Sequence, residues 1–249
     1  MGKEFVGSSR KALTMRKTAI LLGASSGIGK EMALLLASQN WQVAITGRRQ
    51  NLLDEIAATN PDAILTAAFD VNEVETLPDR LDTLVAQLNG LDLLVVSAGC
   101  GYLNTELASA PELQTISTNV TAFTASITWA FNYFKKQNHG HIAAITSVAG
   151  MLGGADGPAY AASKAYQINY LDSVAKLAKK EKGNCQITEL RPGSVNTDMM
   201  KGEGHFWIST PQDAARLACE AISKGKRLQY ISKRWRIVGF ILRCLYLFK

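Results

Sequence analysis

The stretch Gly23-Ala24-Ser25-Ser26-Gly27-Ile28-Gly29 follows a short apolar run, Thr18–Leu22, and precedes a segment with helical periodicity. Its glycines let the chain turn sharply and let backbone N–H groups approach a pyrophosphate. The N-terminus of the following helix adds a dipole that favours an anion. The spacing G-x-x-x-G-x-G also occurs in ordinary turns, but its place between a strand and a helix favours dinucleotide binding.

The rest of the chain repeats this alternation of strand and helix. Further apolar runs of strand length lie at Trp41–Ile45, Ala63–Phe69, Leu91–Val96, Ile142–Ile145 and Cys185–Leu190, with an edge strand at Arg227–Ile231. Helical segments are expected at about 28–38, 50–58, 73–89, 112–137, 158–181 and 211–224. Nearly continuous apolar strands are typical of a parallel sheet covered on both faces. The pattern predicts an α/β fold: a single-domain, Rossmann-type, doubly wound parallel sheet of about seven strands with helices on both faces.

One domain accounts for most of the chain. Its 249 residues are 47% hydrophobic, and no Pro/Gly/Ser-rich linker divides them. We expect the domain to span 15–232, beginning at Met15, with 1–14 as a dispensable extension and 233–249 as a basic and apolar tail helix.

Composition narrows the function. The formal charge is +6, with basic residues collected near the C-terminus, and this cluster lacks the aromatic platform of a nucleic-acid site. No nucleic-acid partner is therefore expected. The four cysteines are far apart and show no metal-ligand spacing, so we expect no metal and a reducing, cytoplasmic location.

The end of the second strand indicates which dinucleotide would bind. NAD sites carry an acidic residue there, but this chain has Thr46-Gly47-Arg48-Arg49. Arg48 can form charge-assisted hydrogen bonds to a 2′-phosphate, whereas Arg49 could share that work or face water. The sequence therefore predicts NADP(H) as the cofactor.

Tyr160 and Lys164 lie four residues apart near the start of a predicted helix, and this spacing places them on one face. A neighbouring ammonium favours the phenolate and is expected to lower the pKa of the tyrosine from its usual value of about 10. The pair is a candidate general acid and base, although the Tyr-x-x-x-Lys pattern alone often arises by chance.

Taken together, these features resemble the short-chain dehydrogenase/reductase family over about residues 16 to 230. The landmarks occur in the family's order: the glycine stretch, Asp70-Val71, Ala98-Gly99, Asn119, Ser147, Tyr160-Ala161-Ala162-Ser163-Lys164 and Arg191-Pro192-Gly193. One departure is Val96-Ser97-Ala98-Gly99, where the family often has Asn-Asn-Ala-Gly. Those asparagines brace the sheet, so the departure concerns local stability more than chemistry.

The resemblance implies a catalytic role for four residues. Tyr160 would exchange a proton with the substrate oxygen, and Lys164 would lower the pKa of the phenol and hold the nicotinamide ribose. Ser147 would hydrogen-bond the substrate oxygen, and Asn119 would hold a water that links Lys164 to solvent. Ser147 could instead be a strand-end turn residue, and Asn119 a surface residue of a helix.

It also implies a set of cofactor contacts. Asp70 and Val71 would contact the adenine, although Asp70 could simply cap a helix that begins near Asn72. The full set of expected cofactor-binding residues is Gly23, Ser25, Ser26, Gly27, Ile28, Gly29, Arg48, Arg49, Asp70, Val71, Ala98, Gly99, Tyr160, Lys164, Pro192, Gly193, Val195 and Thr197.

The segment Val195–Ser209 is expected to form a flap over the substrate, with Met199, Met200, Phe206 and Trp207 as apolar contacts. Val148, Met151 and Leu152 would extend this wall, so a partly apolar substrate is expected. The same side chains could instead pack the flap onto the body. The tail at 233–249 is too short to span a bilayer and could cover the cleft, cover a partner subunit or lie on a membrane surface.

Three functions fit these observations. The first is an NADP(H)-dependent oxidoreductase that acts on a carbonyl or secondary alcohol, with Tyr160 as general acid and base. The second is a catalytically silent NADP(H)-binding scaffold or sensor. The third is a lipid carbonyl reductase at the inner face of a membrane. The resemblance also implies a homodimer or homotetramer that associates through the helices at 112–137 and 158–181.

Overall fold

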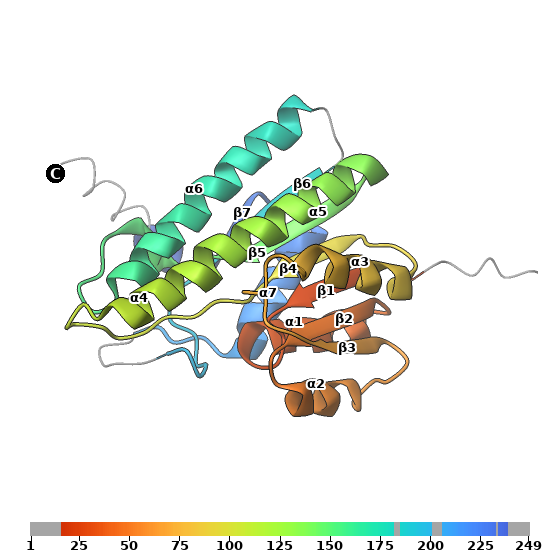
Figure 1. Ribbon diagram of the computed structural model, residues 1–249, viewed down its shortest axis with the longest axis horizontal. Coiled ribbons are helices and arrows are strands. Elements are labelled where there is room, and N and C mark those ends of the chain that lie inside the picture. The colour runs from red at the N-terminus through yellow and green to blue at the C-terminus, as the bar shows by residue number, and fades with distance from the viewer. Residues whose placement is uncertain (1–15, 182–184, 201–205, 233, 239–249) are drawn as a thin grey trace, which may run out of the picture.

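The protein folds around one parallel sheet, seen in a computed structural model that describes residues 16–181, 185–200, 206–232 and 234–238. The sheet has the order β3-β2-β1-β4-β5-β6-β7 (Figure 1). The strands are β1 (Thr18–Leu22), β2 (Gln42–Gly47), β3 (Ile64–Ala68), β4 (Leu93–Val96), β5 (Gly140–Ile145), β6 (Cys185–Pro192) and β7 (Leu228–Ile231).

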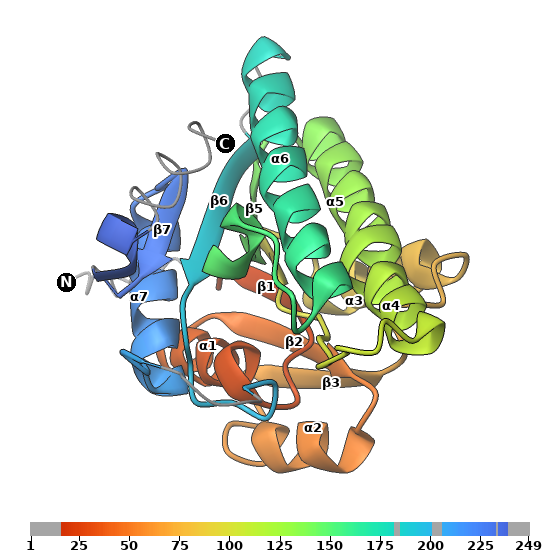
Figure 2. The same cartoon turned by 90° about the vertical axis from the view of Figure 1, so that its left-hand side faces the viewer.

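Helices cover both faces of this sheet (Figures 1 and 2). One layer consists of α1 (Gly27–Ser38), α2 (Gln50–Ala57) and α7 (Pro211–Ser223). The opposite layer consists of α3 (Leu77–Leu88), α5 (Phe123–Gln137) and α6 (Pro158–Lys180), with α4 (Ser109–Ile116) packed against α6. The fold is the doubly wound Rossmann-type sheet that the sequence predicts.

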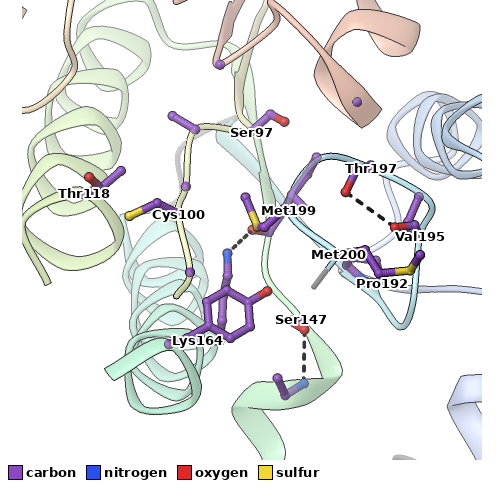
Figure 3. A pocket seen from close by; sticks show the side chains of 18 of the residues that line it. Ser97, Cys100, Thr118, Ser147, Lys164, Pro192, Val195, Thr197, Met199 and Met200 are labelled. Carbon is purple, nitrogen blue, oxygen red and sulfur yellow. Dashed lines mark hydrogen bonds between the residues drawn. The ribbon is translucent and has the colours of Figure 1, made fainter. Parts of the chain in front are cut away.

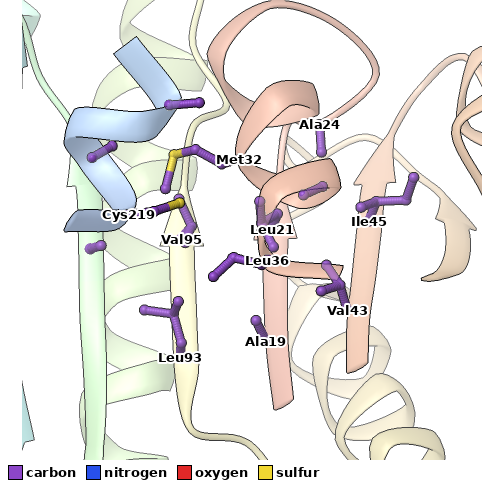
Figure 4. Close-up of a cluster of buried hydrophobic side chains, with 14 of the residues drawn as sticks. Ala19, Leu21, Ala24, Met32, Leu36, Val43, Ile45, Leu93, Val95 and Cys219 are labelled. Atoms are coloured by element: carbon purple, nitrogen blue, oxygen red, sulfur yellow. The ribbon is translucent and has the colours of Figure 1, made fainter. Parts of the chain in front are cut away.

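The alternating direction of strand side chains divides the core into two parts. Ala19 and Leu21 of β1 pack toward α1 and α7, whereas Ile20 and Leu22 pack toward α3 and α5. Figure 4 shows the first part, with Leu21, Val95 and Met32 gathered between the sheet and the helices. Because both faces are covered, every residue of β1 is buried, which explains its uninterrupted apolar sequence.

The prediction of one continuous helix over 112–137 is wrong. The chain forms α4, then a π-helical stretch at Ser117–Ala122, and then α5. Each residue of a π-helix adds a bond from i to i+5, which widens the turn and shifts the side chains around the axis. Asn119 lies in this stretch and is fully buried, so the alternative of a surface residue is also wrong.

A smaller correction concerns the segment after β3. The Asp70 carboxylate accepts a hydrogen bond from the Asn72 backbone N–H at 3.0 Å, which forms a turn. The next helix, α3, begins only at Leu77, with Pro78 in its first turn. Asp70 therefore does not cap a helix at residue 72, and the helix predicted over 73–89 begins four residues later.

The strand order reverses direction between β1 and β4, which creates a crevice outside the carboxyl ends of the strands. The segments that follow β1, β4 and β5 all reach this edge, and ligands of doubly wound folds bind there. The predicted extension at 1–14 and most of the predicted tail, residue 233 and residues 239–249, lie outside the described residues.

Candidate active site

A cavity of about 980 Å³ opens at the carboxyl edge of the sheet. Of the residues predicted for the site, only Gly29 and Asn119 do not line it. The predicted residues that do are Gly23, Ser25, Ser26, Gly27, Ile28, Arg48, Arg49, Asp70, Val71, Ala98, Gly99, Ser147, Tyr160, Lys164, Pro192, Gly193, Val195 and Thr197. The fold thus brings segments that lie between Gly23 and Thr197 to one cleft.

The glycine stretch forms a tight turn in which two of the glycines cannot be replaced by a larger residue. Gly23 has a φ of +83°, and a Cβ there would lie 2.5 Å from the backbone nitrogen of Ala98. A Cβ at Gly29 would overlap the Gly23 carbonyl oxygen. Both positions need glycine because the turn after β1 packs directly on the turn after β4. Gly29 therefore acts through this packing and not at the cavity surface.

Two arginines lie at the same end of the cavity but have different partners. The Arg49 guanidinium donates hydrogen bonds to the Ser25 and Ser26 hydroxyls at 2.9 and 2.8 Å. The Arg48 guanidinium lies 3.7 Å from the Asp70 carboxylate instead. Of the two, Arg49 is the one joined to the glycine stretch, which the sequence left undecided.

The candidate catalytic side chains come from the segment after β5 and from α6. Ser147, in the segment after β5, accepts a hydrogen bond from the Ala149 N–H at 3.1 Å at the start of a 3-10 turn, Val148–Met151. The Lys164 ammonium donates to the carbonyl of Ile145 at 3.0 Å. Figure 3 shows Ser147 and Lys164 between Cys100 on one side and the segment with Pro192 on the other.

Lys164 is held by a buried polar network. Its ammonium also donates to the Gln167 side-chain oxygen at 2.9 Å, and the Gln167 amide donates to the Asn119 backbone carbonyl at 2.9 Å. The Asn119 side chain clasps the Cys100 backbone, accepting from its N–H at 2.9 Å and donating to its carbonyl at 2.8 Å. Asn119 also donates to the Ser163 hydroxyl at 3.0 Å. The π-helical turn thus joins the segment after β4 to α6.

Burial sets the ionisation of this centre. It lowers the pKa of Lys164 to about 8, because an ammonium is poorly solvated there. It also raises the pKa of the Tyr160 phenol, and a hydrogen bond from Ser147 only partly offsets this effect. The expectation that Lys164 lowers the pKa of Tyr160 is therefore not met in this structure, in which desolvation has the largest effect. The Lys164 nitrogen lies 5.8 Å from the centroid of the phenol ring.

The other wall of the cavity is apolar. It includes Met199, Met200 and Phe206 of the predicted flap, and Val148 and Leu152 after β5. Two expected members lie elsewhere. Trp207 does not line this cavity, and Met151 packs its sulfur against the Arg191 guanidinium at 3.8 Å. Val195 and Ser209 form an isolated bridge, which ties the two ends of the flap together.

A family model described as short chain dehydrogenase matches residues 17–206. The chain belongs to the short-chain dehydrogenase family. An "Uncharacterized oxidoreductase" of Myxococcus xanthus is 32% identical over 219 residues, which cover 84% of this chain and 85% of that protein. Carbonyl reductase family member 4 of Xenopus tropicalis is 30% identical over 190 residues, covering 76% of this chain and 79% of the relative.

Solved structures share the fold at lower identity. The NADP-bound structure of ElxO has a TM-score of 0.76 and 22% identity, covering 87% of this chain and 97% of that one. The 3-ketoacyl-(acyl-carrier-protein) reductase from Brucella melitensis, complexed with NADH, has a TM-score of 0.76 and 20% identity, covering 85% and 94%. These similarities support the architecture described above.

Three residues of this family member escaped the sequence analysis. Gln167 stands one helical turn after Lys164, and that i, i+3 spacing was a usable signal. Cys100 lies directly after the landmark Ala98-Gly99 and lines the cavity. Trp235 reaches the cavity from the segment after β7, and only the general suggestion that the tail could cover the cleft pointed to it.

Proposed function

We propose that the protein is an NADP(H)-dependent oxidoreductase that acts on a carbonyl or secondary alcohol, with Tyr160 as the general acid and base. The observation that carries this proposal is the shared cavity: Tyr160, Lys164 and Ser147 line the same space as the glycine cradle. A proton-exchanging phenol beside a dinucleotide cradle is the arrangement that hydride transfer to a carbonyl needs.

The cradle fits a phosphorylated dinucleotide. The glycine stretch lines the cavity at the N-terminus of α1, where backbone N–H groups and the helix dipole favour a pyrophosphate. Arg49 with Ser25 and Ser26 offers donors for a 2′-phosphate. The NADP-bound neighbour ElxO supports this choice. Asp70 and Val71 would contact the adenine, and Pro192, Val195 and Thr197 the nicotinamide end. When bound, the nicotinamide supplies or accepts the hydride.

The protein's share of the chemistry is proton transfer and positioning. A phenol with its ordinary pKa of about 10 is already protonated at neutral pH, and burial raises the pKa of Tyr160 further. The phenol can therefore donate its proton to a developing alkoxide during reduction. Ser147 would hold the same substrate oxygen. Lys164, whose pKa is about 8, can exchange a proton near neutral pH and so restore the phenol. Gln167 and Asn119 keep the ammonium in place.

The substitution Tyr160→Phe tests the proposal because it removes only the hydroxyl. We expect kcat to fall by about 10²–10⁴-fold with any accepted carbonyl, since general acid catalysis contributes about that much. NADPH binding, followed by the cofactor's fluorescence, should stay within about twofold. Tyr166→Phe is the matched control: it lies on the same helix, and its hydroxyl bonds Thr124 at 2.7 Å.

Turnover that survives in Tyr160→Phe would reject the assigned mechanism. A wild-type protein that binds NADPH tightly but reduces no ketone, aldehyde or acyl carbonyl of a broad panel would instead favour a catalytically silent scaffold.

A further inference from the structure

Trp235 is an unusual member of the cavity wall because it comes from beyond the last strand. It lies in a short helical segment at 234–238, with only 6% of its surface exposed. Its ring packs against Gly193 so closely that a Cβ there would overlap the indole. It stacks on Phe206 of the flap, with ring centroids 5.1 Å apart and an interplanar angle of 28°.

The rings of Trp235 and Phe206 therefore meet from two distant segments and face one space. Both line the cavity, together with Met199, Met200 and Val238. Tyr160 and Ser147 line the same cavity, from α6 and from the segment after β5. The reacting centre and this aromatic wall thus line the same open cavity, so a substrate held at Tyr160 could extend toward the aromatic wall.

The indole N–H indicates that ordinary core packing does not account for the ring. A buried tryptophan usually finds a hydrogen-bond partner for this group. Within the described part of the chain, the Trp235 N–H is buried and has no partner. The ring packs on Gly193, Phe206 and Trp207, and its unpaired N–H carries a free-energy cost that a purely structural apolar residue would avoid.

We propose that Trp235 and Phe206 form a specificity subsite that stacks a flat apolar group of the substrate, such as a phenyl ring attached a few bonds from the carbonyl. The inference rests on the proposed function and names its substrate class. Offset stacking and apolar burial favour such a group. The neighbouring methionines adapt to its outline because their side chains are flexible. Small carbonyl compounds would reach Tyr160 but leave this wall unused.

Two ketones that differ only in the ring test the subsite: 4-phenylbutan-2-one and butan-2-one, each with NADPH. The wild type should prefer the phenyl ketone by about tenfold or more in kcat/KM. Trp235→Ala should remove most of that preference, mainly through KM, while turnover of butan-2-one stays within about twofold. Trp235→Phe keeps a stacking ring and should retain more than half of the preference on a logarithmic scale.

Trp207→Ala is the matched control. Trp207 belongs to the same aromatic cluster, with its ring centroid 5.9 Å from that of Trp235, but it does not line the cavity. The preference should therefore survive this substitution. Phe206 belongs to the other segment of the subsite, and Phe206→Ala should reproduce the effect of Trp235→Ala. If Trp235→Ala does not fold or does not bind NADPH, Phe206→Ala decides the question alone.

Several outcomes would overturn the subsite. They are a wild type with no preference for the phenyl ketone or no turnover of either, an equal loss in Trp207→Ala, and a complete loss in Trp235→Phe. The proposed function fails separately. In that case Tyr160→Phe keeps its activity, whatever the ratio between the two ketones.

Discussion

The positively charged side chains at the two ends of the cavity differ in their exposure to solvent. At the cofactor end the arginine side chains are open to solvent, with Arg49 49% and Arg48 67% exposed. At the catalytic end Lys164 is 4% exposed and its partner Gln167 is fully buried. Solvent and salt screen the charges of the two arginines, whereas desolvation sets the pKa of Lys164. We therefore expect salt to affect cofactor binding and pH to affect the catalytic centre.

The strongest test of this contrast is Lys164→Met, which keeps much of the side-chain length but removes the ammonium. We expect kcat to fall by about 10²–10⁴-fold, because the proton exchange assigned to Lys164 is lost. Stopped-flow or steady-state NADPH oxidation measures this effect. Lys176→Met is the control on the same helix, where the lysine side chain is 76% exposed and pairs with Asp172. Equal losses in the two variants would refute the contrast.

The buried lysine should also leave a mark on stability in the absence of cofactor. Its pKa is about 8 in the fold and 10.5 as a free side chain, so the unfolded chain binds more protons between these values. Unfolding free energy should therefore rise with pH from about 8 to 10.5, by up to about 3 kcal/mol relative to Lys164→Met. Urea unfolding at pH 8 and pH 10 measures this difference.

The comparison between variants matters because two thiols act in the opposite direction. Burial raises the pKa of Cys185 to about 11 and of Cys219 to about 12. Each lowers stability as pH rises above about 9, but equally in the wild type and in Lys164→Met. A pH dependence that is the same in both proteins would show that Lys164 is not the buried titrating group.

At the exposed end the expected effect is smaller. Arg49→Ala should weaken NADPH binding by about 10- to 100-fold, the value of one or two charge-assisted hydrogen bonds, and leave NADH binding within about twofold. Arg48→Ala, beside Asp70, should change NADPH binding less. Titration of cofactor fluorescence at low and high salt measures both variants. An effect confined to Arg48→Ala would reverse the assignment of the two arginines.

Patterns that repeat along the chain allowed the sequence to predict the sheet and most helices. In β1 each face of the strand is buried, so an unbroken apolar run identified it correctly. The pair Tyr160 and Lys164 followed from helical spacing. Arg48 and Arg49 are adjacent, and no pattern tells which one points to the glycine stretch. The desolvation that dominates the pKa of Tyr160 depends on packing around the ring, which spacing does not reveal.

The features that the sequence did not predict depend on contacts between distant segments. Nothing in Ser117–Ala122 marks a π-helical turn, because the clasp between Asn119 and Cys100 exists only after folding. The close packing of Trp235 on Gly193 joins positions far apart in sequence. Such contacts are known only from the tertiary structure, because the propensities of neighbouring residues do not depend on them.

The π-helical turn at Ser117–Ala122 has a consequence for the rod formed by α4 and α5. In an α-helix each residue advances about 100° around the axis, so one extra residue in a turn rotates everything that follows. The rod can therefore present one face to the cavity before the turn and an independently chosen face to the sheet after it, where Phe123, Ile127 and Phe134 are buried. Removing one residue from this turn would force a single helical phase on both halves. The side chains that face the core and those that face the cleft could then not both keep their positions.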